Sequence, residues 1–243
     1  MHVHVPKPLH GWREFLHEVA IIVLGVLVAL GLEQVVTSSH DRASAAETRA
    51  SIRSEIAQSL QRILRRQRTE ACLLRRLREI AVFLDATSQG QHPTRPTWIG
   101  APYAPLAGDT AFKSAQSAGK FFLLPQSEQE RIDVFYVDGT DFNEQNTREW
   151  YDWAQLRSLT SPGTQLTESE VTRLRQALQD ARGADWLIRE DISEFIRRAK
   201  QEGITAHDRP IAAEQLAPAC LPIDMPYARA SANAIRKDLG VPE

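Results

Sequence analysis

Residues 19–32 read VAIIVLGVLVALGL, fourteen residues without one charged or strongly polar side chain. No other stretch of the 243-residue chain is comparable, and side chains this apolar have to leave water. A membrane span needs about 20 apolar residues. Taking in the neighbours Phe15, Leu16, Val35 and Val36 gives 22 residues, or about 33 Å of helix at 1.5 Å per residue. We therefore expect a transmembrane anchor at residues 15–36, after a short tail at residues 1–14.

The residues that flank the apolar run support this interpretation. Glu18 and Glu33 lie near its two edges, and Trp12 and Arg13 lie where an interfacial ring and a snorkelling cation are found. A cleaved signal peptide and a buried core helix are the alternatives. Acids in the leading region argue against the first, and the lack of a polar face argues against the second. The lipid-facing anchor is represented by Val19, Ile22, Gly25, Ala29 and Leu32.

Gly25 and Ala29 are four residues apart, so they form a small face on which two anchors can pair. The orientation of the anchor is less constrained, because the basic residues on its two sides nearly balance. A short tail followed by a single domain is typical of proteins whose N-terminus stays in the cytoplasm. We therefore expect the domain, residues 37–243, on the outer side of the membrane.

The remaining chain has the periodicity of an all-α protein, a bundle around three long helices with Pro-rich connections. The helices are expected at about residues 40–88, 127–159 and 167–202, with a shorter one at 109–118. No Pro or Gly occurs between Gly31 and Gly90, so the anchor can continue into the first helix, fraying at residues 37–39. The core stripe of that first helix is predicted to consist of Ile52, Ile56, Leu60, Ile63, Leu74, Leu77, Ala81 and Leu84.

Capping boxes are expected at SEQE (residues 127–130) and at TESE (residues 167–170), where a hydroxyl and a carboxylate bind backbone N–H groups. Gly203 is expected to end the last long helix. The final forty residues are rich in Pro, and they are expected to wrap the bundle before a short helix at residues 229–239.

The chain has two cysteines, Cys72 and Cys220. Neither belongs to a Cys-x-x-Cys motif or a Cys/His cluster, so a zinc site is not expected. Two separate thiols and one disulfide between them are both open. The disulfide becomes the better interpretation if the domain faces an oxidising compartment.

Charge is distributed in two opposed runs. Seven arginines lie between residues 62 and 78: Arg62, Arg65, Arg66, Arg68, Arg75, Arg76 and Arg78. Eight acids lie between residues 126 and 153: Glu128, Glu130, Asp133, Asp138, Asp141, Glu144, Glu149 and Asp152. Because the two runs belong to neighbouring helices, we expect intramolecular pairing and solvated faces. With a net charge of −2, nucleic acid is not an expected partner.

Catalytic and cofactor motifs are absent from the sequence. It contains no Gly-x-Ser-x-Gly elbow, P-loop or Gly-x-Gly-x-x-Gly. His17-Glu18 begins no zinc motif, because Ile21 stands where the second histidine would be. No catalytic, cofactor-binding or metal-binding residue is therefore predicted. Trp150, Tyr151, Trp153 and Trp186 are expected to pack in the core, the alternative being a ligand pocket between helices.

The head of the chain resembles a family of uncharacterised bacterial proteins. The resemblance rests on KPLHGWREF (residues 7–15), EVAIIVLGVLVAL (residues 18–30) and Glu33-Gln34, a Glu-led anchor with a Gly-Val-Leu-Val-Ala-Leu core. It implies a single-pass inner-membrane protein with a helical domain of unknown role, and it implies no catalytic residues.

These observations favour an extracytoplasmic, non-enzymatic module anchored in a bacterial inner membrane, with a periplasmic domain for protein interaction or ligand sensing. Its expected partners are membrane lipid, contacted through residues 15–36, and either an unknown protein or a second copy of the chain. The alternatives are a structural scaffold that oligomerises through the anchor and first long helix, and an enzyme whose site is too dispersed to recognise.

Overall fold

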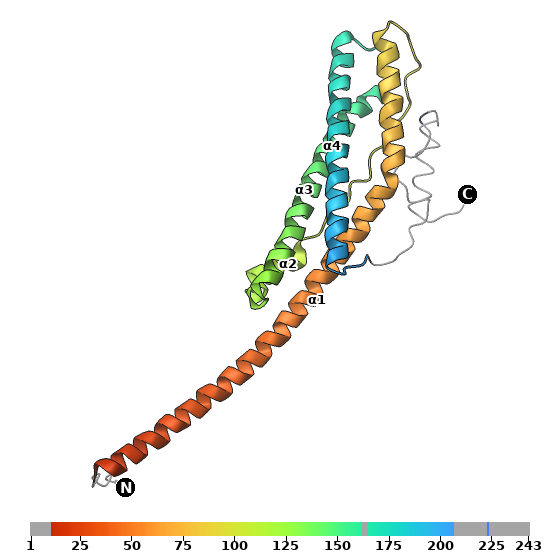
Figure 1. Cartoon of the computed structure of the whole chain (residues 1–243). Helices are drawn as coiled ribbons and strands as arrows, with labels where there is room; N and C mark the ends of the chain where they lie inside the picture. The colour runs from red at the N-terminus through yellow and green to blue at the C-terminus, as the bar shows by residue number, and fades with distance from the viewer. Residues whose placement is uncertain (1–10, 162–164, 207–222, 224–243) are drawn as a thin grey trace, which may run out of the picture.

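The computed structural model describes residues 11–161, 165–206 and 223, and within these the chain forms helices and no strand. The elements are α1 (Trp12–Ser88), α2 (Thr110–Ser117), η1 (Lys120–Leu123), α3 (Gln126–Leu156), η2 (Arg157–Thr160) and α4 (Glu168–Gln201). Helix α4 packs against α3 and against the second half of α1, and it runs antiparallel to both (Figure 1). The all-α prediction and its bundle of three long helices are confirmed.

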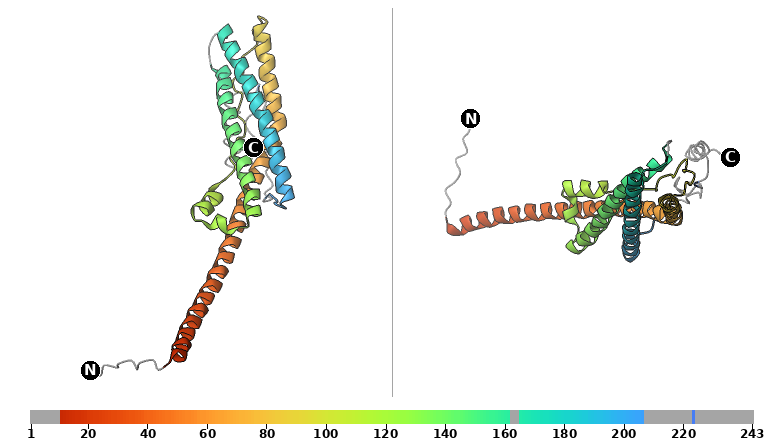
Figure 2. Two further views of the ribbon diagram at one scale, coloured as in Figure 1. Left: turned by 60° about the vertical axis from the view of Figure 1, so that its left-hand side comes forward. Right: turned by 90° about the horizontal axis from the view of Figure 1, so that it is seen from above.

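Helix α1 is continuous over 77 residues. The anchor continues into the helix predicted at 40–88, as the lack of Pro and Gly allowed, and the fraying predicted at residues 37–39 does not occur. Gly90, with a φ of 78°, follows the end of α1 in the left-handed conformation that glycine adopts without steric cost. The first half of α1 extends away from the bundle as a single rod (Figure 2). No flexible linker therefore separates the predicted anchor from the bundle.

The bundle core consists of two apolar clusters that follow one another along the helices. The first cluster includes Ile52, Ile56, Leu60, Ile63, Ile132, Phe135, Phe142, Ile188, Ile192 and Phe195. The second cluster includes Leu73, Leu77, Ile80, Leu84, Trp153, Leu156, Leu174, Leu178 and Ala181. Leu73 and Ile80 take the core positions that we predicted for Leu74 and Ala81, which are only half-buried. The predicted Leu77 and Leu84 are buried, and between the two clusters the core stripe runs through Arg66 and Thr69.

The two capping boxes have different outcomes. At α4 the prediction is confirmed, since Thr167 Oγ1 accepts from the Glu170 N–H and the Glu170 carboxylate accepts from the Thr167 N–H. At α3 it is wrong, because the N-cap residue is Pro125 and the helix begins at Gln126, two residues before the start that a Ser127 cap would give. A proline pre-sets the backbone at a helix start without a side-chain cap. Gly203 follows the end of α4 with a φ of 61°, as predicted. The helix predicted at residues 229–239 lies outside the described residues.

Candidate functional site

Three charged side chains meet inside the bundle, one from each long helix. Arg66 of α1 donates from Nη2 to Glu149 Oε1 of α3 at 2.8 Å and to Asp185 Oδ1 of α4 at 3.2 Å. All three side chains are at most 1% exposed. We call these three residues the charge layer. It lies between the two apolar clusters and connects all three helices of the bundle.

The helical periodicity of the core residues explains why these three charged side chains point into the bundle. Arg66 comes three residues after Ile63, and Glu149 comes four residues before Trp153. Asp185 lies between Ala181 and Ile188 in the same way. Each charged side chain therefore occupies a position that its helix turns toward the core. Our sequence analysis missed these residues as a site, although a polar residue at core spacing in all three helices was the signal.

The electrostatics of the charge layer are unbalanced, with one buried guanidinium between two buried carboxylates. Arg189 supplies further positive charge from the edge of the layer, with Nε 3.2 Å from Asp185 Oδ2. Burial disfavours a charged carboxylate, and Asp185 repels it; together they raise the pKa of Glu149 to about 7 against the opposing attraction of Arg66. Glu149 is therefore a buried acid that can exchange a proton near neutral pH.

Several polar atoms around the charge layer are not satisfied within the described part of the chain. Glu149 Oε2, Asn146 Oδ1 and Trp153 Nε1 are buried and make no hydrogen bond there. Asn146 uses its Nδ2 on the Phe142 carbonyl oxygen, at 2.9 Å. Unsatisfied buried polar groups cost free energy, so this layer is the part of the core that can gain most from a proton or a small polar molecule.

A second group of shifted acids lies along the packing of α3 and α4. Burial raises the pKa of Asp191 to about 6, helped by repulsion from Asp141, Asp138 and Glu190. The pKa of Asp138 is also raised by burial, although Arg198 Nε lies 2.7 Å from its Oδ2 and opposes the shift. These acids are less buried than Glu149, and they extend the pH sensitivity of the bundle beyond the charge layer.

The predicted charge pairing between the two opposed runs is confirmed at Arg66 and Glu149. Other arginines of the run bind neutral groups of the connection at residues 90–108. Arg62 donates to the Leu106 carbonyl oxygen, Arg65 lies over the Tyr103 ring, and Arg76 lies over the Trp98 ring. The basic run therefore holds the bundle and its long connection together.

The prediction that four aromatic residues pack in the core is wrong for three of them. Trp153 is fully buried, whereas Trp150, Tyr151 and Trp186 are 45%, 65% and 54% exposed. The reason is register: the core positions on these turns belong to Glu149 and Asp185, so the residues that directly follow them point away. Trp150 and Trp186 lie at the level of the charge layer, because both acids contact Arg66.

The predicted anchor residues Val19, Ile22, Gly25, Ala29 and Leu32 all lie on the first half of α1, and all are exposed. By its length and composition this half of α1 could span a membrane, and none of its most apolar window is buried. An added Cβ at Gly25 would meet nothing within 4 Å. The face predicted for helix pairing is therefore open within the described residues.

Cys72 is half-buried on α1 and is not a free thiol. Its predicted partner, Cys220, lies outside the described residues, so the bridge between the two stays a prediction. Among the described residues, no group of three or more His, Cys, Asp or Glu side chains could hold a metal ion.

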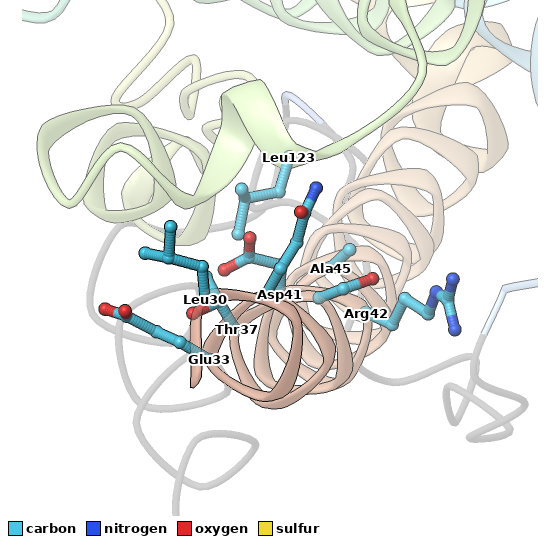
Figure 3. Close-up of a pocket in the computed structure, with 9 residues that line it drawn as sticks. Leu30, Glu33, Thr37, Asp41, Arg42, Ala45 and Leu123 are labelled. Atoms are coloured by element: carbon cyan, nitrogen blue, oxygen red, sulfur yellow. The ribbon is translucent and has the colours of Figure 1, made fainter. Parts of the chain in front are cut away.

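Three of the cavities on the surface of the described part are large enough to consider. The first, about 630 Å³, lies between the middle of α1 and Leu123 of η1 (Figure 3). The second, about 450 Å³, lies between the end of α1 and the residues around Pro93. The third, about 230 Å³, shares Phe83, Pro93 and Arg95 with the second. None of the three includes Glu149 or Asp191, so these cavities do not bring shifted acids together as a hydrolytic site would require.

Comparisons with protein-family models, with curated proteins and with solved structures find no match to this chain.

Proposed function

We propose that this chain is a single-pass protein of a bacterial inner membrane that presents a three-helix bundle on the periplasmic side, for binding a partner protein or sensing a ligand. The observation that carries this proposal is the continuity of α1. One helix supplies an exposed apolar segment of spanning length and then one third of the bundle core. The role is one of binding and transmission, without a catalytic site.

The rigid connection gives the module a mechanism. A bundle joined to its anchor by a flexible linker cannot pass on a change in packing, whereas a continuous helix moves as one body. Helix α1 contributes Arg66 to the charge layer, and Arg66 forms ion pairs with Glu149 of α3 and Asp185 of α4. Protonation of Glu149, or a polar ligand at its free oxygen, would alter how α1 packs against the other two helices.

The exposed aromatic side chains of α3 and α4 are the best candidates for partner binding. Trp150, Tyr151, Trp186 and Leu187 are exposed at the level of the charge layer. Large aromatic side chains dominate the energetics of many protein interfaces. A partner bound to these side chains would contact residues adjacent to Glu149 and Asp185, and binding would thereby be coupled to the buried charges.

Topology and fractionation test this proposal together. Alkaline phosphatase fused after Glu243 is expected to be active, and the full-length chain is expected to sediment with membranes until detergent is added. A variant that lacks residues 1–36 serves as the matched control, and it should stay in the supernatant. Sedimentation of both forms, or neither, would contradict the anchor; an inactive phosphatase beside an active cytoplasmic reporter would reverse the orientation.

A scaffold function is the second candidate, and the open face at Gly25 favours it. Replacing Gly25 and Ala29 with Leu would block close approach of two anchors. If the scaffold function holds, the variant loses the self-association that the parent chain has in detergent. A parent chain that is monomeric, or a variant that associates equally well, would exclude pairing through this face.

A further inference from the structure

The short helices α2 and η1 lie at the end of the bundle from which the first half of α1 emerges (Figure 1, Figure 2). Three successive residues of η1 have different surroundings. Phe121 is 2% exposed and contacts Phe112 edge to face, with ring centroids 5.2 Å apart. Phe122 and Leu123 are 67% and 39% exposed. One aromatic ring therefore fixes η1 in the core, while the next two apolar side chains remain uncovered.

The uncovered side chains are held in place by the rest of the domain. Glu55 of α1 accepts hydrogen bonds from the backbone N–H groups of Ala111 and Phe112, at 2.9 and 3.3 Å, and from the Tyr136 hydroxyl at 2.8 Å. This carboxylate caps α2, whose own N-cap residue makes no side-chain hydrogen bond. Gly119, with a φ of 71°, turns the chain between α2 and η1. Phe122 and Leu123 are thus presented on a turn that is fixed to α1.

Leu123 also lines the cavity of about 630 Å³ that runs along α1 (Figure 3). On the α1 side this cavity begins at Leu30, inside the apolar run, and passes Thr37 and Asp41 to Ala45. Asp41 comes five residues after Val36, about 7 to 8 Å further along a helix. The headgroup layer outside the hydrocarbon core is about 5 to 8 Å thick on each side. The cavity therefore spans the depth at which acyl chains give way to headgroups.

We propose that η1 inserts Phe122 and Leu123 into the interfacial layer of the leaflet that α1 enters, and that lipid fills the cavity beneath Leu123. This inference rests on the proposed membrane span. Interfacial aromatic and aliphatic side chains on a short helical turn are the usual means of such insertion. The charges beside the cavity are mixed, with Glu33, Asp41 and Arg42 on α1 and Lys120 on η1. Insertion is accordingly driven by apolar burial, and zwitterionic lipid suffices.

Insertion gives the bundle a second contact with the membrane. With α1 alone, the bundle can tilt about the point where the helix leaves the lipid. With η1 seated in the same leaflet, the tilt is fixed by two points, one on each side of the cavity.

Depth-dependent fluorescence quenching tests this inference on the full-length chain in phosphatidylcholine vesicles. A small environment-sensitive fluorophore is introduced at position 122 as an unnatural amino acid, which spares both cysteines; position 122 is exposed, so the core is not disturbed. Val82, which is 70% exposed near the far end of α1, is the matched control outside the membrane, and Leu24 is the control inside it. Two phosphatidylcholines serve as quenchers: one is brominated on the acyl chain close to the headgroup, at the depth expected for position 122, and one is brominated near the chain end, at the depth expected for position 24.

The expected result is strong quenching at positions 122 and 24 and none at position 82. Quenching at position 24 without quenching at position 122 overturns the insertion of η1 and leaves the span intact. An absence of quenching at both positions means that the proposed span itself fails. A blue-shifted but unquenched probe at position 122 assigns the face to protein, such as a second copy of the chain, and also overturns the inference.

Discussion

Residues 12–39 and residues 40–88 belong to one continuous helix, yet their side chains have opposite surroundings. The apolar side chains between Val19 and Leu32 are exposed, while Ile52, Ile63 and Leu84 are completely buried. We call the two segments the apolar half and the bundle half of α1. The bundle half also buries Arg66 and Arg76, which are far more polar than any residue of the apolar run.

The comparison shows that hydropathy alone does not decide what a helix buries. The backbone of an α-helix satisfies its own hydrogen bonds, so both halves can form the same structure in different surroundings. The two halves differ in what their side chains contact. The bundle half alternates apolar and polar residues and packs on α3 and α4, whereas the apolar half has no polar face with which to remain wet.

The largest effect on the free energy of unfolding is expected from replacing the buried Arg66 of the bundle half with an apolar residue, such as those of the apolar half. Arg66→Leu adds an apolar residue to the core, but it leaves Glu149 and Asp185 buried without their shared cation. Removing one partner of a buried ion pair costs about 3–5 kcal/mol. We expect the free energy of unfolding to fall by that amount, measured by urea denaturation in mild detergent.

The matched control for this variant is Arg68→Leu, on the exposed face two residues further along α1. It should change the free energy of unfolding by no more than about 0.5 kcal/mol. Equal losses in the two variants would show that Arg66 acts only through its bulk or helix propensity. The triple replacement of Arg66, Glu149 and Asp185 by apolar residues should recover much of the stability, because no charge is then left unpaired.

Most of the fold was predictable from local signals. The absence of Pro and Gly between Gly31 and Gly90 predicted the unbroken α1, and the box at Thr167 predicted the start of α4. At α3 the prediction failed although residues 127–130 have the sequence of a capping box, because the helix begins earlier, directly after Pro125. Cap motifs report only the local chain, and the choice between two helix starts, Pro125 and Ser127, depends on the packing of the connection before them.

The second effect is a pH dependence of the bundle, which the apolar half of α1 should not share. Glu149 has an ordinary pKa of about 4.5 when unfolded and a pKa of about 7 in the bundle. The folded chain therefore binds the proton more tightly, so this group's contribution makes the free energy of unfolding fall as pH rises from about 4.5 to 7. The difference corresponds to at most roughly 3 kcal/mol. The raised pKa of Asp191, to about 6, acts in the same direction.

Glu149→Gln tests this contribution, because the amide oxygen can still accept from Arg66 without titrating. The variant should show a flatter dependence of unfolding free energy on pH between 5 and 7 than the parent chain. Asp191→Asn, at a less buried acid, is the comparison and should flatten it less. Parallel pH profiles for the parent chain and Glu149→Gln would contradict the assignment.

The charge layer was harder to predict than the helices. Counting charges identified the two opposed runs and predicted that they pair, but not which members are buried. The core position of each residue depends on helical phase, and beyond Ile63 we placed Leu74 and Ala81 where Leu73 and Ile80 are buried. We also predicted that Trp150 faces the core, and neighbouring residues on a helix do not face the same way, so Glu149 was not recognised as a core residue. Exposure of Phe122 and Leu123 depends on tertiary contacts of η1, for which the sequence carries no periodic signal.

The smallest effect is expected from Gly→Ala substitutions, which compare the bundle with the apolar half of α1 by adding a single methyl group. Gly183 is exposed on α4, and an added Cβ there would meet nothing within 4 Å. Gly183→Ala should therefore stabilise the bundle by about 0.5–1 kcal/mol, since glycine loses more freedom on folding. Gly139→Ala should gain less or lose stability, because its Cβ would lie 3.2 Å from Ala107 Cβ.

Gly25→Ala is the control in the apolar half. Its Cβ also meets nothing within 4 Å, but the helix at this point contributes no packing to the bundle. The free energy of unfolding of the bundle, followed by urea denaturation in detergent, should therefore stay unchanged. A gain at Gly25 as large as that at Gly183 would mean that the apolar half unfolds together with the bundle. The two halves would then form one cooperative unit, in spite of their different surroundings.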